Sequence, residues 1–170
     1  MSTIIHERPG VYSSYDASTV IRSGVGSKVV GIAAQAGTGE ADAVTLLTSY
    51  AAGVTAFGET GAMAPLLRLL FQNGATAVKA VRVESSTAYA DAFDLLALEE
   101  DIQIVVCDSA DETVQQTLRT SVESASAARR ERIAVVGGEE ESVEELIAHA
   151  SALNSERVVL VGPDVLDTAG

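Results

Sequence analysis

The side chains best suited to covalent chemistry in this sequence are a single cysteine, Cys107, and two histidines, His6 and His149. Cys107 ends the apolar run 102–107, and α/β folds gather catalytic groups at the carboxyl ends of strands. A nucleophilic thiolate needs a nearby base, which either histidine could provide. A lone cysteine in such a run is also typical of a small buried hydrophobe. Because His6 lies in an irregular segment and His149 in a predicted helix, the structural interpretation of Cys107 is favoured.

Carboxylates are the second group that could carry chemistry. Asp108 and Asp111 follow Cys107, where their charges would stabilise the amino end of the next helix. A denser run suggests a site for a hard metal ion and consists of Glu139, Glu140, Glu141, Glu144 and Glu145. This run lacks the Asp/Asn/Gly pattern of a calcium loop, and a solvated helix start explains it. The sequence therefore predicts no metal ligand, no cofactor and no catalytic residue.

A phosphate-binding loop would be expected directly after a strand of an α/β sheet. The loops 108–111 and 137–141 follow predicted strands, but both are acidic and neither matches G-x-G-x-x-G or the Gly-Lys-Ser/Thr loop. The segment 24–28, Gly-Val-Gly-Ser-Lys, precedes a strand instead of opening a helix. A small doubly wound nucleotide-binding module or enzyme is therefore the alternative interpretation, not the favoured one.

Composition indicates a folded protein made in the cytosol. The chain has 170 residues, of which 47% are hydrophobic. No apolar run approaches the roughly 18 residues that a spanning helix needs. The amino-terminal residues lack the pattern of a secretory signal, and one cysteine cannot form an internal disulfide. Since a formal charge of −13 repels a phosphate backbone, we expect neither nucleic-acid binding nor membrane insertion.

Charge is divided unevenly along the chain. Residues 1–83 carry six basic and five acidic side chains, whereas residues 84–170 carry five and nineteen. This asymmetry predicts two different surfaces. The only basic cluster is Arg129, Arg130 and Arg132, which we expect to balance neighbouring acids or to meet an acidic face of another subunit.

The first part of the chain predicts an extended arm at 1–22 and a small α/β domain at 23–83. Pro9 and Gly10 interrupt any helix in the arm, and its apolar residues show no helical period. In the small domain the pattern predicts strands at 28–34, 44–48 and 77–83 and helices at 49–57 and 62–73. Ser49 is the predicted cap of the first of these helices.

The second part, residues 84–170, predicts an αβα sandwich with a parallel, Rossmann-like sheet. We expect helices at 88–98, 110–128 and 143–153 and strands at 102–107, 133–136 and 158–161. Capping boxes are predicted for Ser109 with Glu112 and for Ser142 with Glu145. The predicted inward faces are Val114, Leu118, Val122 and Ala125 in one helix and Val143, Leu146, Ile147 and Ala150 in the next. Three strands are about half of a usual doubly wound sheet, so we expect this domain to be incomplete at Gly170.

The arm has too many apolar residues to be stable in water by itself. They are Ile4, Ile5, Val11, Tyr12, Val20 and Ile21. Extended backbone offers the hydrogen bonds of a strand, so we expect the arm to dock on its own body or on a partner.

Several short segments, taken in order, are similar to the amino-terminal portion of the contractile tail sheath family of phages, prophages and phage-tail-like bacteriocins. They are residues 7–12 (Glu-Arg-Pro-Gly-Val-Tyr), 29–33 (Val-Val-Gly-Ile-Ala), 47–50 (Leu-Thr-Ser-Tyr) with 57–58 (Phe-Gly), and 70–74 (Leu-Phe-Gln-Asn-Gly) leading into 81–83 (Val-Arg-Val). The resemblance covers about the first 83 residues, and the region after residue 84 is similar to the family only in architecture.

This resemblance implies a structural subunit and not an enzyme. Subunits of this kind polymerise in stacked rings around an inner tube by exchanging strands, and they contract to drive the tube through a cell envelope. The resemblance implies that Ile4, Ile5, Val11 and Tyr12 of the arm contact an adjacent subunit. The implied partners are copies of the chain, the inner tail tube protein, and baseplate and tail terminator proteins. The implied location is the bacterial host cytoplasm during assembly, and then the virion or phage-tail-like particle.

Overall fold

A computed structural model of the protein describes residues 28–138 and 142–162. Within them, strands and helices alternate along most of the chain. The strands are β1 (Val29–Gln35), β2 (Val44–Leu47), β3 (Ala77–Val83), β4 (Ile104–Cys107), β5 (Ile133–Gly137) and β6 (Val158–Val161). The helices are α1 (Tyr50–Phe57), α2 (Met63–Gln72), α3 (Tyr89–Leu98), α4 (Glu112–Ala127) and α5 (Val143–Leu153).

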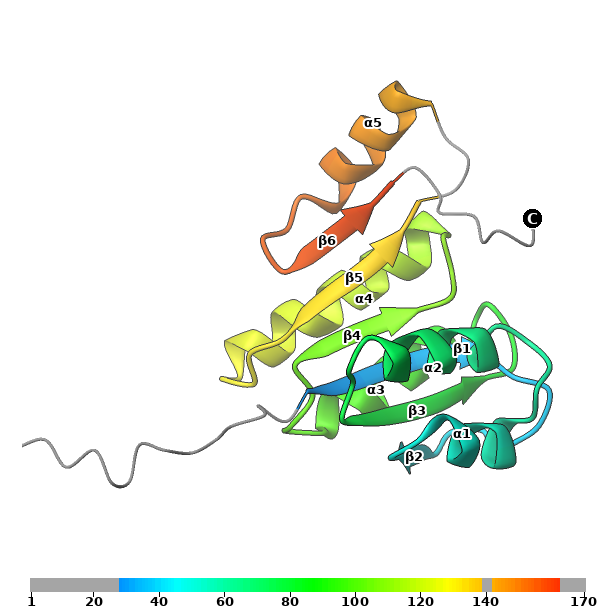
Figure 1. The fold of residues 1–170 in the computed structure, drawn as a ribbon. Coiled ribbons are helices and arrows are strands. Elements are labelled where there is room, and N and C mark those ends of the chain that lie inside the picture. The colour runs from blue at the N-terminus through cyan, green and yellow to red at the C-terminus, as the bar shows by residue number, and fades with distance from the viewer. Residues whose placement is uncertain (1–27, 139–141, 163–170) are drawn as a thin grey trace, which may run out of the picture.

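All six strands form one sheet in the order β2-β3-β1-β4-β5-β6 (Figure 1). Every neighbouring pair is parallel except β2 and β3, which are antiparallel. The expected α/β class with a mainly parallel sheet is therefore confirmed. β1 lies inside the sheet between β3 and β4, and its residues from Val29 to Ala34 are all buried, as expected for a strand covered on both faces.

Helices cover the two faces of the sheet unequally. Figure 1 shows α1 and α2 on one side of β1 and β3, and α3 and α4 on the other side of the sheet. The layer formed by α1 and α2 buries Phe57, Met63 and Leu67 against Ile32 and Val78. The second layer is larger and packs α3, α4 and the end of α5 against β1 and β3–β6. Burying each large side chain in these layers contributes about 1.5–3 kcal/mol relative to leaving it exposed.

A glycine allows close packing in the central strand. A Cβ atom at Gly31 would lie 3.1 Å from Ile102 Cδ1 and 3.4 Å from Leu96 Cδ2. A side chain at this position would require Ile102, just before β4, to move by a few tenths of an ångström, so the close packing of this layer depends on Gly31.

Two of the three predicted helix caps are confirmed. Ser49 caps α1 by accepting a hydrogen bond from the Ala52 N–H, and Ser142 forms the expected capping box with Glu145. The capping box predicted for Ser109 is wrong, because Asp111 is the cap of α4 and accepts hydrogen bonds from two backbone N–H groups. Asp111 lies immediately before the helix, so its short carboxylate reaches these donors directly.

The predicted inward face of α4 is confirmed, but that of α5 is largely wrong. Val143 and Ile147 are 68% and 61% exposed, and Ala150 is exposed as well. The side chains of α5 that reach the core are His149 and Leu153. The reason is the position of α5 at the end of the sheet, where it contacts α4 and, among the described residues, no further strand or helix lies beyond β6.

The sheet continues across residue 83, where the sequence suggested a boundary between two domains. β1 pairs with β3 on one side and with β4 on the other, so strands of both parts join in one ladder. The three parallel strands expected after residue 84 therefore extend the sheet of β1, β2 and β3 to six strands instead of forming half of a separate sheet.

Candidate interaction surfaces

The carboxyl ends of β1 and β4 are held together by Asp108. Its Oδ2 atom accepts a hydrogen bond of 3.0 Å from the Gln35 backbone N–H, and its Oδ1 atom accepts one from the Tyr89 hydroxyl. Burial of the phenol, together with the hydrogen bond to Asp108, raises the pKa of Tyr89 above its ordinary value. The helices that follow β1 and β4 lie on opposite faces, and doubly wound folds bind phosphates at such a crevice. Both carboxylate oxygens of Asp108 are engaged there, so its negative charge lies in this crevice and would repel a bound phosphate.

The amino end of α4 is filled by side chains of the protein itself. Asp111 Oδ1 accepts hydrogen bonds from the N–H groups of Thr113 at 2.8 Å and Val114 at 3.1 Å. Gln115 is fully buried and donates from Nε2 to the carbonyl oxygens of Ser109 and Gly137. The predicted role of Asp111 as a helix-terminal charge is confirmed, and Gln115 ties the loop after β4 to the end of β5.

Cys107 lies at the end of β4 and is partly buried. Its thiol donates a hydrogen bond to the Ser109 carbonyl oxygen, with 3.6 Å between the sulfur and oxygen atoms. Burial raises the pKa of its thiol to about 11. At neutral pH the group is therefore a neutral thiol and a weak nucleophile. Of the two bases considered, His149 is buried on α5 and His6 lies outside the described residues.

The acidic run at the start of α5 serves the helix end. Glu145 Oε2 accepts hydrogen bonds from the Ser142 N–H and hydroxyl, each 2.8 Å long, which lower the pKa of Glu145. Glu144 is exposed in the first turn, where the helix dipole favours it. Among residues 28–138 and 142–162 no group of three or more His, Cys, Asp or Glu side chains could hold a metal ion, and Glu139–Glu141 lie outside these ranges.

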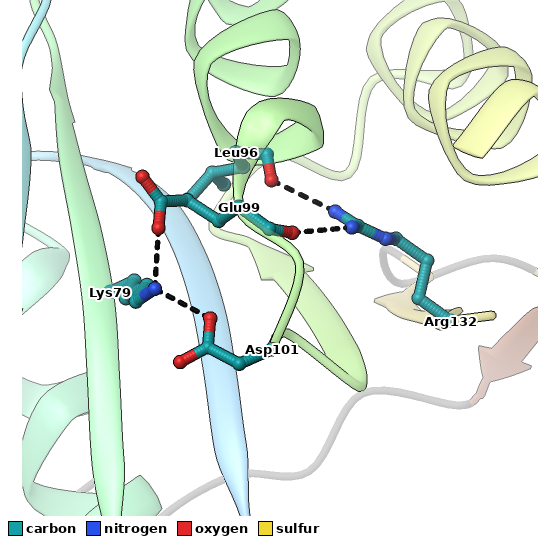
Figure 2. A network of polar contacts seen from close by, with 5 residues as sticks. All are labelled: Lys79, Leu96, Glu99, Asp101 and Arg132. Carbon is teal, nitrogen blue, oxygen red and sulfur yellow. Dashed lines mark hydrogen bonds and ion pairs between the residues drawn. The ribbon is translucent and has the colours of Figure 1, made fainter. Parts of the chain in front are cut away.

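Near the amino ends of the strands, Lys79 of β3 binds two carboxylates of the turn between α3 and β4 (Figure 2). Its Nζ atom contacts Glu99 Oε2, and it lies 2.5 Å from Asp101 Oδ1. Burial lowers the pKa of Lys79, but these two hydrogen bonds outweigh it, so the net shift is upward. The hydrogen bond from Lys79 also lowers the pKa of Asp101.

Arg132 secures the same turn from the side of β5, as Figure 2 shows. Its side chain is 3% exposed and donates from Nη1 to the Leu96 carbonyl at 2.8 Å and from Nη2 to the Glu99 carbonyl at 2.6 Å. Burial is the main reason why the pKa of Arg132 is lowered from its ordinary value, and the nearby charge of Arg130 adds to it. Arg132 thus caps the end of α3. Arg129 and Arg130 line a surface hollow together with Glu100.

Sequence reasoning missed these two clusters. A signal existed for each of them. Lys79 lies within a predicted buried strand, and Arg132 lies directly before another predicted strand. Charges in such places are buried only when they are paired or hydrogen-bonded.

One face of β4, β5 and β6 is apolar and carries no described helix. Strand alternation places Val105, Ala134 and Leu160 toward α3, α4 and α5, so the residues between them point to the opposite side. That side presents Ile104, Val106, Ile133, Val135, Val159 and Val161, of which the last two are 47% and 45% exposed. Figure 1 shows α1 and α2 over β1 and β3 but not over β4–β6.

The outer side of α3 forms a second, smaller apolar surface. Leu98 is 68% exposed and lines a hollow of about 370 Å³ with Leu95, Asp42, Asp91 and Asp94. A groove of about 420 Å³ runs between α3 and α4 and is lined mainly by alanine, serine and threonine side chains. The described part of the chain contains no helix long and apolar enough to cross a membrane. The four arm residues predicted to contact a neighbour, Ile4, Ile5, Val11 and Tyr12, lie outside the described residues.

No protein-family profile matches the chain, and no curated protein matches it by sequence. Solved structures match its fold, among them the following two. The contracted helical sheath of the anti-feeding prophage (AFP) aligns with a TM-score of 0.57 and 20% identity, over 92% of this chain and 45% of that one. A chain of the six-fold symmetrised AFP baseplate structure aligns with a TM-score of 0.57 and 19% identity, over 92% of this chain and 46% of that one.

The chain thus spans less than half the length of the chains that it matches. At about 20% identity, the alignments establish a shared fold and do not by themselves establish shared partners or activity. They confirm the resemblance seen in the sequence at the level of the fold, so this chain has the α/β fold found in a contractile sheath protein.

Proposed function

We propose that this protein is a structural subunit of a contractile sheath, and that it assembles with copies of itself around an inner tube. The observation that carries the proposal is the fold shared with the AFP sheath chain over 92% of this chain. The sequence segments similar to the sheath family, which lie within residues 7–83, support it independently.

The chemistry of the sheet edge agrees with a structural role. The crevice where a doubly wound fold would bind a phosphate holds Asp108, and the following helix is capped by Asp111. The thiol of Cys107 has a pKa of about 11 and is engaged with a backbone carbonyl. No described observation favours the alternative of a nucleotide-binding module or enzyme.

In this role the protein performs work by changing its packing, not by catalysis. A sheath assembled in a metastable extended form contracts when its subunits repack through more favourable contacts. The arm, through Ile4, Ile5, Val11 and Tyr12, joins adjacent subunits as an added strand, so that subunits slide and rotate without separating. The further partners are the inner tube protein, the baseplate and the tail terminator, met in the host cytoplasm before the particle is complete.

Electron microscopy and analytical ultracentrifugation of the purified protein test this function. We expect rings or tubes at high protein concentration, and we expect deletion of residues 1–22 to abolish them while circular dichroism and the melting temperature show a retained fold. Tyr12→Asp should act like the deletion, because it places a charge in an apolar contact, whereas Ser13→Asp is the matched control. Strictly monomeric protein at all concentrations, or normal polymers of the deletion variant, would contradict the proposal.

A further inference from the structure

The outer side of α3 and the start of β2 border an apolar hollow of about 370 Å³, which we call the α3 hollow. Its apolar walls are Leu95 and Leu98, and Leu98 is 68% exposed. Leu46 of β2 pairs with Lys79, so its side chain lies on the same face of the sheet as α3, and it is 60% exposed. The helix that packs against β2, α1, belongs to the opposite layer. All residues from 28 to 138 are described, so these exposures do not arise at an end of the described chain.

The charged residues that line the α3 hollow are all acidic. They are Asp42, Asp91 and Asp94. All three are exposed, and among the described residues their side chains form no hydrogen bond or ion pair. An apolar wall beside unpaired carboxylates fits a side chain that has an aliphatic stem and a positive end. Arginine combines the two, and its planar guanidinium donates two parallel hydrogen bonds to a carboxylate.

The turn between α4 and β5 carries two adjacent arginines that lack an acidic partner. Arg129 is exposed and Arg130 is half-buried, and neither side chain forms an ion pair or hydrogen bond within the described part of the chain. Among the other described arginines, Arg68 alone is likewise unpaired, and it lies by itself on α2. The turn therefore presents two stems and two guanidinium groups side by side.

The backbone of Arg129 has a conformation that glycine usually adopts. Its φ angle is 63°, in the left-handed region. The N–H groups of Arg129 and Arg130 bond back to the carbonyls of Ser126 and Ala125, each over 2.9 Å, which is the Schellman pattern that ends many helices. A side chain at this position costs stability relative to glycine. A residue that is unfavourable for its own backbone indicates that its side chain has a role outside the turn.

Charge selects this turn over other faces of a second copy as the occupant of the α3 hollow. The chain has a formal charge of −13, so most contacts between copies bring like charges together. Residues 84–170 hold five basic side chains against nineteen acidic ones. Three of the five are bonded within their own chain, namely Arg119, Arg132 and Arg157. Arg129 and Arg130 are the two that remain for a contact with an acidic surface.

We propose that Arg129 and Arg130 of one copy of this chain dock in the α3 hollow of a second copy. The arginine stems pack over Leu98, and the guanidinium groups pair with the carboxylates of Asp91 and Asp94. The turn and the hollow are different patches, so the contact is heterologous and repeats from copy to copy, as a ring or helical assembly requires. The inference rests on the proposed sheath function and names one surface through which its subunits join.

Charge reversal in the full chain tests the contact. Arg129→Glu and Asp94→Arg should each raise the protein concentration needed for self-association about tenfold, as measured by analytical ultracentrifugation. Arg68→Glu and Glu59→Arg are the matched controls, because they reverse exposed and unpaired charges outside both surfaces. The controls should change this concentration less than about twofold. Control variants that weaken self-association as much as the test variants would overturn the proposal.

Mixing the two test variants makes the experiment specific. In an equimolar mixture, the intact turn of Asp94→Arg meets the intact hollow of Arg129→Glu, and the two reversed charges meet in the next contact. We therefore expect the mixture to self-associate at a lower concentration than either variant alone. A mixture that behaves like its separate components would overturn the pairing of these two surfaces.

Arg129→Gly separates docking from folding. Glycine fits the positive φ angle, so this variant should raise the melting temperature of the unassembled protein while weakening self-association as Arg129→Glu does. A loss of self-association in Asp94→Arg alone would assign the hollow to another occupant and overturn the proposal. Normal assembly of both Arg129→Gly and Asp94→Arg would refute the contact and leave the sheath function intact, whereas a parent chain that never self-associates would refute both.

Discussion

Arg132, directly before β5, donates a hydrogen bond of 2.8 Å from Nη1 to the carbonyl oxygen of Leu96 in the last turn of α3. A second bond, from Nη2 to the Glu99 carbonyl, is 2.6 Å long. Carbonyls at the end of a helix lack partners within the helix and carry its partial negative charge. The buried guanidinium of Arg132 supplies hydrogen-bond donors to these carbonyls and a positive charge beside their partial negative charge. It also joins residues that are 36 positions apart in the chain.

Replacing Arg132 therefore destabilises the fold. Arg132→Met keeps much of the aliphatic volume but removes the guanidinium donor from two carbonyls, of which that of Leu96 keeps its hydrogen bond from the Glu99 N–H. We expect a loss of about 2–3 kcal/mol in the free energy of unfolding. Urea unfolding followed by circular dichroism measures this loss. Arg130→Met, on the more exposed neighbour, is the control and should change stability by less than about 0.5 kcal/mol. Equal effects of the two variants would show that the Arg132 contacts contribute little.

The cap of α4 gives a second prediction. Asp111→Ala removes the acceptor of two backbone N–H groups and should cost about 1–2 kcal/mol. Ser109→Ala removes only an acceptor for the Asp111 N–H and should cost less than about 0.5 kcal/mol. Thermal unfolding of both variants distinguishes the observed cap from the one that the sequence suggested. A larger effect of Ser109→Ala would favour the latter.

The contacts of Asp108 predict a third result. Asp108→Ala leaves the Gln35 N–H and the Tyr89 hydroxyl without their acceptor and should lower stability by about 2 kcal/mol. Tyr89→Phe removes one of the two bonds and should cost about half as much. In the double variant the two effects should not add, because the residues share one interaction. Strict additivity in a double-mutant cycle would argue against their coupling.

Stability should also fall at alkaline pH, partly because of Cys107. Its pKa is raised from 9.0 to about 11, so the folded protein holds this proton more tightly than the unfolded chain does. The resulting stabilisation is complete below pH 9 and is lost as the pH rises through about 11. Between pH 8 and 11, the free energy of unfolding of the Cys107→Ala variant should therefore fall by about 2 kcal/mol less than that of the parent protein. Denaturant unfolding across this range measures the difference, and parallel curves for the two proteins would contradict it.

Much of the local structure could be predicted from the sequence, because it depends on neighbouring residues. Alternating apolar strands and helices specify an α/β fold, and Ser49 and Ser142 cap their helices through donors three residues away. The inward face of α4 follows from its own helical period. The resemblance to a sheath protein, built from short ordered segments, was likewise confirmed as a shared fold.

What only the tertiary structure decided were relationships between distant residues. The period of α5 identifies an apolar stripe, but whether Val143 and Ile147 are buried depends on what packs beyond β6. Pairing of β1 with β4 merges two sequence regions into one sheet, and no local pattern specifies which strands become neighbours. Lys79 and Arg132 meet the turn after α3 only because that sheet brings them there. Local propensity acts through bonds along the chain, whereas strand order and burial are fixed by the packing of the whole molecule.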